Sequence, residues 1–149
     1  EAALLRGPSG AGKSDLTLRL IDEGFHRSAR LVADDQVALA VEDGRLVARP
    51  PAALAGRMEV RGIGIVDIDH LAEATVALIV DLVDREGVER LPEMDSEAIL
   101  GISLAPFEAS APAKLRLALA RATAHMSARA GLGADEDADA DEGEDGVDR

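Results

Sequence analysis

One stretch of eight residues near the start of the chain combines residue types that bind phosphate groups. The segment GPSGAGKS, residues 7–14, fits the pattern G-x-x-x-x-G-K-[ST] of a phosphate-binding loop. In such a loop, backbone N–H groups cradle phosphate oxygens, Lys13 neutralises the β and γ phosphates, and Ser14 offers its hydroxyl to Mg²⁺. The spacing therefore predicts a site for a nucleoside triphosphate or another polyphosphate, formed by Gly7, Pro8, Ser9, Gly10, Ala11, Gly12, Lys13 and Ser14. The alternative is a fortuitous glycine-rich turn.

Two adjacent carboxylates, Asp34 and Asp35, follow the apolar residues LVA at 31–33. We expect 31–33 to form a strand. Adjacent side chains of a strand point to opposite faces, so both carboxylates reach one site only if the chain turns there. One carboxylate would then lie by Mg²⁺, and the other would take the proton of an incoming hydroxyl as general base. The alternative is a pair of acids that cap a turn.

The segment MEVRGIGIVDI, residues 58–68, predicts a function less clearly than the phosphate loop does. Its start is strand-like, and Glu59 and Arg61 would share one face of a strand. There, a carboxylate and a guanidinium could bind a metal ion and a phosphate. Gly62 and Gly64 allow the backbone to approach a ligand closely. On spacing alone, an ion pair on an edge strand is the better interpretation.

The elements that must position these groups follow from the apolar pattern. AALLR (2–6) predicts a short buried strand that runs into the loop. KSDLTLRLIDEG (13–24) predicts a helix with Gly24 as its C-terminal cap. VALAV and LVAR, around residues 37–49, predict a hairpin that turns at Asp43-Gly44.

The second half of the chain contains two strand patterns and one helix pattern. TVALIVDLV (75–83) predicts a central strand, and ILGISL (99–104) predicts another. A helix is predicted from Pro112 to Ala130, with Ser110 as N-cap and two glycines, Gly131 and Gly133, at its end. Because strands outnumber helices, the fold class is α/β with a mixed sheet and flanking helices around the phosphate loop.

Composition narrows the functional class. Cysteine is absent, which excludes disulfides and thiolate metal sites, and no apolar run is long enough to predict a membrane-spanning helix. The chain has two Phe and no Tyr or Trp, so base stacking on single-stranded nucleic acid is not expected. We expect a soluble cytoplasmic protein.

The formal net charge of −13 is concentrated at the C-terminal end, where residues 133–149 hold nine of the 29 acidic residues and one arginine. Such a segment cannot bury apolar surface, so we expect a disordered, solvating tail; binding to a basic partner is the alternative. The remainder is mildly acidic, which argues against duplex nucleic acid. We therefore divide the chain into a P-loop catalytic domain, residues 1–130, and an acidic tail, residues 131–149.

Taken together, GPSGAGKSDLTLRLIDEG, RLVADD and MEVRGIGIVDI resemble the catalytic domain of bacterial HPr kinase/phosphorylase. The resemblance covers about residues 1 to 130, and EVRGIGI is its most specific part. It implies a phosphoenolpyruvate-carboxykinase-like P-loop fold. It also implies transfer of phosphate from ATP, with Mg²⁺, to a serine of the phosphocarrier protein HPr, and the reverse phosphorolysis.

The resemblance also implies roles for single residues. Lys13 matches the catalytic lysine, Ser14 the magnesium ligand and Asp35 the aspartate that takes the serine proton. Asp34 would lie by the metal, and Glu59 matches a second metal-binding residue. Arg90, in the segment ERLPE, aligns with an active-site arginine of the family.

Members of this family form hexamers, and this chain resembles the short form found in alphaproteobacteria. The sequence is also compatible with two other functions. A small-molecule kinase could use the same loop on a metabolite, and a nucleotide-sensing module could bind ATP without turnover.

Overall fold

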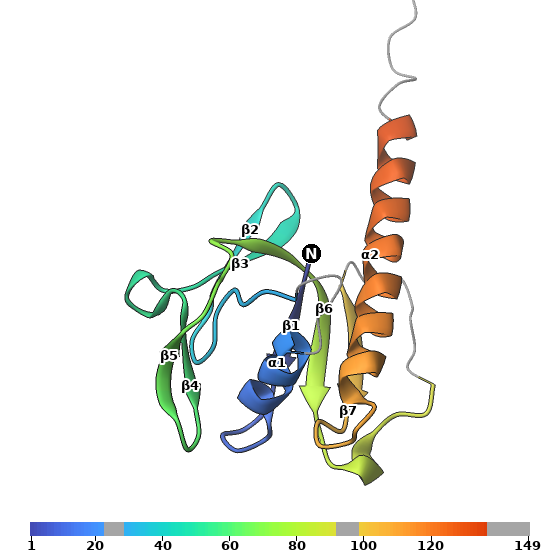
Figure 1. Cartoon of the computed structure of the whole chain (residues 1–149). Helices are drawn as coiled ribbons and strands as arrows, with labels where there is room; N and C mark the ends of the chain where they lie inside the picture. The colour runs from blue at the N-terminus through green and yellow to red at the C-terminus, as the bar shows by residue number, and fades with distance from the viewer. Residues whose placement is uncertain (23–28, 92–98, 137–149) are drawn as a thin grey trace, which may run out of the picture.

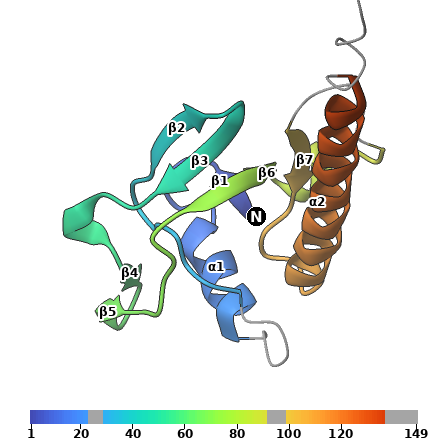
Figure 2. The same ribbon diagram turned by 90° about the horizontal axis from the view of Figure 1, so that it is seen from above.

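Two helices pack against a mixed β-sheet, and a separate hairpin stands beside them (Figures 1 and 2). The computed structural model describes residues 1–22, 29–91 and 99–136. Helix α1 (Lys13–Asp22) follows the phosphate loop, and helix α2 (Ala111–Glu136) closes the described chain. Among these residues, no helix is both long and apolar enough to cross a bilayer.

Strand β6 (Ala74–Leu82) is the centre of the five-stranded sheet. Strand β1 (Ala2–Arg6) pairs with it in parallel on one side, and β7 (Leu100–Leu104) pairs in parallel on the other. The first residues of β6 also pair, antiparallel, with β3 (Arg45–Arg49), which continues to β2 (Ala38–Glu42). The prediction of a mixed sheet with flanking helices is confirmed.

The hydrophobic core lies where β6 meets both helices. Leu16 of α1 and Leu78 of β6 are fully buried, and α2 contributes Ala111, Leu115 and Ala122. Aliphatic side chains fill the core because the chain has almost no aromatic residues. Its buried members are Leu16, Ala77, Leu78, Val80, Leu82, Leu100, Leu104, Ala111, Leu115 and Ala122.

The β2–β3 hairpin turns where the sequence predicts it. Asp43 and Gly44 both have positive φ, 49° and 71°. Two consecutive positive φ values define the type I′ turn, whose twist matches that of the flanking strands. The hairpin prediction is therefore confirmed.

The expected strand at 31–33 is wrong. Leu31 makes one isolated bridge with His70, and the N–H of Leu71 donates to the carbonyl of Leu31 over 2.8 Å. The segment touches its neighbour at one point and then bends away, so no ladder forms. This bend is what allows Asp34 and Asp35 to leave the alternating geometry of a strand.

Residues 58–68 form a two-stranded hairpin, β4 (Arg57–Val60) and β5 (Gly64–Asp67), rather than one strand. The strand-like start is confirmed as β4, but Arg61 lies in the turn, where Gly62 has φ +88°. Arg61 and Glu59 therefore do not share a strand face as expected.

Helix α2 departs from its predicted end. It begins at Ala111, so that Ser110 stands at the N-cap position, and its carbonyl accepts from the N–H of Lys114 over 2.9 Å. The helix continues to Glu136, past both glycines that should end it. A glycine inside a helix costs only about 1 kcal/mol, which the neighbouring helix formers offset. The predicted cap at Gly24 lies outside the described residues.

Short 3₁₀ helices lie in the connections between strands: η1 (Ala52–Leu54) precedes the β4–β5 hairpin, and η2 (Arg85–Gly87) follows β6.

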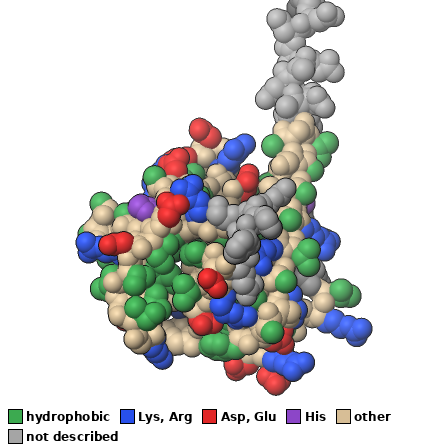
Figure 3. Space-filling model, viewed as in Figure 1, with side chains coloured by type: hydrophobic (Ala, Val, Ile, Leu, Met, Phe, Trp, Pro, Cys, Tyr) green, Lys and Arg blue, Asp and Glu red, His purple; other side chains and the backbone are tan. Residues whose placement is uncertain are grey.

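Hydrophobic side chains gather on the face that carries β4 and β5 (Figure 3), where Ile63 and Ile65 are largely exposed. The hairpin lies next to α1, and β4 contacts that helix.

Candidate active site

The phosphate loop joins the end of β1 to the start of α1, as the motif requires. Gly10 and Gly12 have φ of 82° and 95°, a region that favours glycine. The N–H of Ala11 donates to the carbonyl of Pro8 over 3.0 Å, which closes the turn. The loop therefore presents backbone amides at a helix N-terminus, an arrangement that attracts anions.

The ammonium group of Lys13 folds back over this loop. Its Nζ donates to the carbonyl oxygen of Gly7 over 2.6 Å and to that of Pro8 over 2.9 Å. These two carbonyl partners hold the cation over the loop. A phosphate group bound there can replace the carbonyls as the acceptor, because a charged acceptor bonds more strongly.

Asp34 connects the loop to the β4–β5 hairpin. The Ser14 hydroxyl donates to its Oδ1 over 2.7 Å, and the backbone N–H of Glu59 donates to its Oδ2 over 3.0 Å. Three segments far apart in the sequence therefore meet at one carboxylate. The structure brings together the loop, Asp34 and the 58–68 segment.

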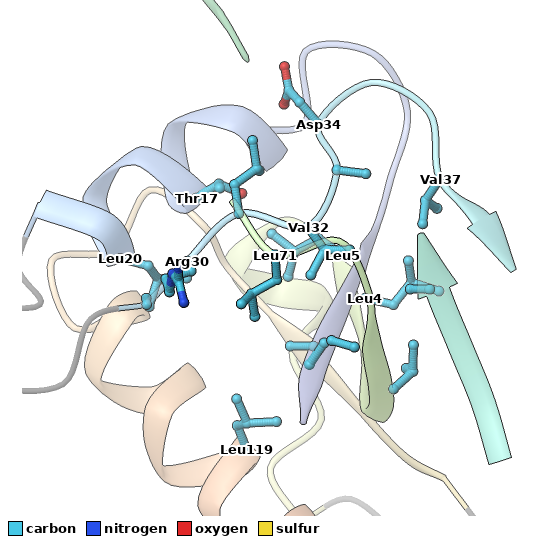
Figure 4. A pocket seen from close by; sticks show the side chains of 18 of the residues that line it. Leu4, Leu5, Thr17, Leu20, Arg30, Val32, Asp34, Val37, Leu71 and Leu119 are labelled. Carbon is cyan, nitrogen blue, oxygen red and sulfur yellow. The ribbon is translucent and has the colours of Figure 1, made fainter. Parts of the chain in front are cut away.

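Asp35 is exposed and, with Asp34 and Lys13, lines a pocket of about 640 Å³. The rest of the pocket is mainly apolar and runs between α1, β1, residues 29–37 and α2. Figure 4 shows the Asp34 carboxylate at the rim, turned away from the leucines. The apolar part includes Leu4, Leu5, Leu20, Leu31, Val32, Leu71, Leu115 and Leu119.

Two predicted site residues, Glu59 and Arg90, do not contribute a side chain to the contacts around Asp34. Glu59 reaches Asp34 through its backbone N–H, and its side chain is exposed. Arg90 lies beyond η2 and is exposed. Within the described ranges, no hydrogen bond or ion pair joins Arg90 to the loop or to the aspartates.

The oxygen donors at the loop suit Mg²⁺. Within the part of the chain that the structure describes, no three His, Cys, Asp or Glu side chains converge as a metal cage. The pair that is present, the Ser14 hydroxyl and the Asp34 carboxylate, consists of hard oxygen ligands 2.7 Å apart. Mg²⁺ commonly takes one or two protein oxygens and completes its shell with water and substrate phosphates. The donor set therefore fits a metal ion that arrives with its nucleotide.

An ion pair that the sequence pattern does not predict lies at the entrance to the loop. Arg6, the residue before Gly7, donates from Nε to Asp81 Oδ1 over 2.8 Å and from Nη2 to Oδ2 over 2.9 Å. The guanidinium of Arg6 holds the pKa of Asp81 below its usual value, mainly through its hydrogen bonds to the carboxylate. Asp81 was hidden in the apolar run 75–83. Only the β1–β6 register, which pairs Arg6 with Asp81, reveals the contact.

Comparison with known proteins identifies the family of the chain. The model of the family described as HPr Serine kinase C-terminal domain matches residues 2–108. Two HPr kinase/phosphorylases are similar over shorter stretches. The protein of Clostridium beijerinckii is 46% identical over 68 residues, and that of Peptoclostridium acidaminophilum is 48% identical over 69 residues.

Each of these matches covers 46% of this chain and 21% of the relative. The match therefore spans about a fifth of the length of these relatives. The Hpr(Ser) kinase/phosphatase from Coxiella burnetii is similar in structure, with a TM-score of 0.64 and 26% sequence identity. That likeness covers 93% of this chain and 91% of the other. Because the family model spans well over half of the chain, the protein belongs to the HPr Serine kinase C-terminal domain family.

Proposed function

We propose that this domain transfers the γ-phosphoryl group of ATP to a serine hydroxyl of an HPr-type phosphocarrier protein. The observation that carries the proposal is the Asp34 carboxylate, which accepts hydrogen bonds from Ser14 and from the Glu59 N–H. This carboxylate connects the phosphate loop to the β4–β5 hairpin, whose sequence distinguishes this family from other P-loop proteins. The names of the curated relatives support HPr as the acceptor.

On the donor side, the amides of residues 7–14 and the Lys13 ammonium bind the phosphates. Lys13 exchanges its two carbonyl partners for β- and γ-phosphate oxygens and stabilises charge as the γ-phosphoryl group departs. Ser14 and Asp34 would hold Mg²⁺, with Glu59 as a further candidate. The ion supplies charge neutralisation at the phosphates when it is bound.

On the acceptor side, Asp35 serves as the base. Its exposed carboxylate accepts the proton of the serine hydroxyl as the seryl oxygen bonds to the γ phosphorus. The bond between that phosphorus and the β–γ bridging oxygen breaks, and ADP leaves. Arg90 enters the proposal from the family resemblance, as an additional cation for the departing charge.

The same groups allow the reverse reaction, which the name phosphorylase of the relatives denotes. An oxygen of inorganic phosphate bonds to the phosphorus of phosphoserine while the bond between that phosphorus and the seryl oxygen breaks. Asp35 takes the proton of the attacking phosphate and gives it to the seryl oxygen, and pyrophosphate is released. We place this chemistry in a cytoplasmic homohexamer, as the family resemblance implies. Light scattering of the purified protein tests the assembly.

The test is incubation of the protein with γ-labelled ATP, Mg²⁺ and an HPr protein. We expect label on a serine of HPr, loss of transfer in Lys13→Ala, and retained ATP binding without transfer in Asp35→Asn. Arg90→Ala should lower the rate of transfer without preventing nucleotide binding. Phosphorylated HPr supplied with inorganic phosphate should release pyrophosphate.

Other outcomes identify other functions. Label on a small molecule and not on HPr would indicate a metabolite kinase. ATP binding without any transfer would indicate a nucleotide sensor. Full activity in Asp35→Asn would remove the proposed base.

A further inference from the structure

The turn between β7 and α2 lies directly against the phosphate loop. A Cβ atom placed on Gly12 would come within 2.9 Å of Cζ of Phe107 and within 3.2 Å of Cγ of Pro106. Strands β1, β6 and β7 are parallel, so their carboxyl ends meet at one edge of the sheet. Ligands of open α/β sheets bind beyond this edge.

This turn is held in place by hydrogen bonds from α1. Arg19 donates from Nη1 to the carbonyl of Pro106 over 2.7 Å and from Nη2 to that of Glu108 over 2.9 Å. Glu108 also pairs with Lys114 at 2.6 Å and with Arg85 at 3.3 Å. Pro106 itself is buried. The backbone on either side of Phe107 is therefore fixed relative to the phosphate loop.

Phe107 leaves its ring in solvent although the core is short of aromatic residues. It is one of two phenylalanines in the chain, and 70% of it is exposed. A single exposed apolar side chain is ordinary on a protein surface. This one is distinguished by its position, because its ring edge lies within 3.1 Å of the place that a Cβ atom on Gly12, the residue before α1, would take.

We propose that the ring of Phe107 is the surface on which the base of the donor nucleotide stacks. The inference rests on the proposed function, in which residues 7–14 hold the phosphates of ATP. The base is joined to those phosphates through one ribose, so it must lie close to the loop. An exposed aromatic face on a backbone anchored there matches the flat, polarisable face of a purine.

This assignment makes Phe107 a determinant of donor specificity. The phosphate loop alone cannot distinguish ATP from a polyphosphate without a base, because amides and Lys13 contact only phosphate oxygens. A stacking contact favours the nucleotide and adds nothing to tripolyphosphate.

The experiment compares ATP with inorganic tripolyphosphate, each titrated with Mg²⁺ into the protein by calorimetry. In Phe107→Ala, the affinity for ATP should fall at least about fivefold, the lower end of base–aromatic stacking, and the affinity for tripolyphosphate should not change. Phe107→Tyr should keep ATP affinity close to wild type. Leu117→Ala is the matched control, since Leu117 is 73% exposed on α2 and should change neither affinity.

Each remaining outcome overturns the inference in a recognisable way. Equal losses for ATP and tripolyphosphate in Phe107→Ala would mean that the ring supports only the loop. An unchanged ATP affinity with a raised KM for HPr would assign the ring to the acceptor. A wild-type protein that binds both ligands equally would reject stacking but keep the phosphate loop, and one that binds neither would also reject the proposed function.

Discussion

A single carboxylate, that of Asp34, does most to assemble the candidate site. Its two oxygens accept from two segments, the Ser14 hydroxyl of the loop and the Glu59 N–H of β4. Neither donor is charged, so the negative charge of Asp34 stays available to a cation that arrives with phosphate. Asp35, the next residue, is exposed, and within the described part of the chain no hydrogen bond joins its side chain to either segment. One aspartate holds the site together, and the other is accessible to an acceptor.

Asp34→Ala should therefore weaken Mg²⁺-dependent nucleotide binding. The variant removes an oxygen ligand and also releases Ser14, and changes to groups that orient metal ligands typically reduce metal affinity about tenfold or more. Titration of Mg²⁺ into the protein with ATP present measures the effect. Asp67→Ala, which removes an exposed carboxylate of β5, is the control. An unchanged Mg²⁺ requirement in Asp34→Ala would exclude Asp34 as a ligand.

The loop glycines allow a second test, because two of them share a backbone conformation but not their surroundings. Gly10 has φ 82° with nothing within 4 Å of an added Cβ, whereas Gly12 has φ 95° with the Phe107 ring at 2.9 Å. Gly10→Ala should cost about 1–2 kcal/mol from the left-handed conformation alone. Gly12→Ala should cost more, as measured by urea unfolding followed by circular dichroism. Equal losses would mean that the ring moves aside freely.

At the scale of elements, the sequence predicted the structures that depend only on residues close together in the chain. Strand β1, helix α1 and the hairpin turn at Asp43-Gly44 follow from spacing and turn chemistry within a few residues. The failures depend on partners elsewhere. Residues 31–33 look like a strand, but among the described residues they have one bridging neighbour, His70. The glycines of α2 do not end the helix, because the residues around them continue it.

The turn before α2 offers a test of pH dependence. Lys114, through its hydrogen bond and its charge, holds the pKa of Glu108 below the usual value of 4.5. Since the folded-state pKa is the lower one, this pair adds stability above the unfolded pKa. That stability is lost as pH falls through the folded-state pKa.

Glu108→Gln should therefore lower the melting temperature at pH 7 and have a progressively smaller effect as the pH is lowered from about 4.5. Thermal melts of both proteins from pH 7 to pH 3 give the comparison. Glu86→Gln in the exposed turn η2 is the matched control. A destabilisation that stays constant down to pH 3 would contradict an ionic contribution from Glu108.

For the whole molecule, the site could be predicted in its parts but not in its assembly. The phosphate loop and the aspartate pair were identifiable from residue types and spacing. The contact of Asp34 with the Glu59 amide required the β4–β5 hairpin to lie against the loop, and the contact of Phe107 with Gly12 required β7 to end beside it. Both depend on pairing across the fold, and a single sequence carries no direct signal for that.

The shared core predicts that the sheet, the helices and the candidate site unfold together. Leu78 is fully buried in β6, in the same cluster as Leu16 of α1 and Leu115 of α2. Leu78→Ala should reduce the free energy of unfolding by about 2–5 kcal/mol, because it removes buried methyl groups and leaves a cavity. Leu117→Ala, on the exposed side of α2, should stay within about 0.5 kcal/mol of wild type.

The measurement needs two probes on the same samples. Because the chain has no Trp or Tyr, far-ultraviolet circular dichroism should report the fold, and a bound fluorescent ATP analogue should report the loop. For Leu78→Ala, both transitions should shift to lower urea and stay coincident, since α1 carries both Leu16 and the catalytic lysine candidate. Release of the analogue well before the loss of helical signal would mean that the loop is not stabilised by this core, and that the site and the sheet unfold as separate units.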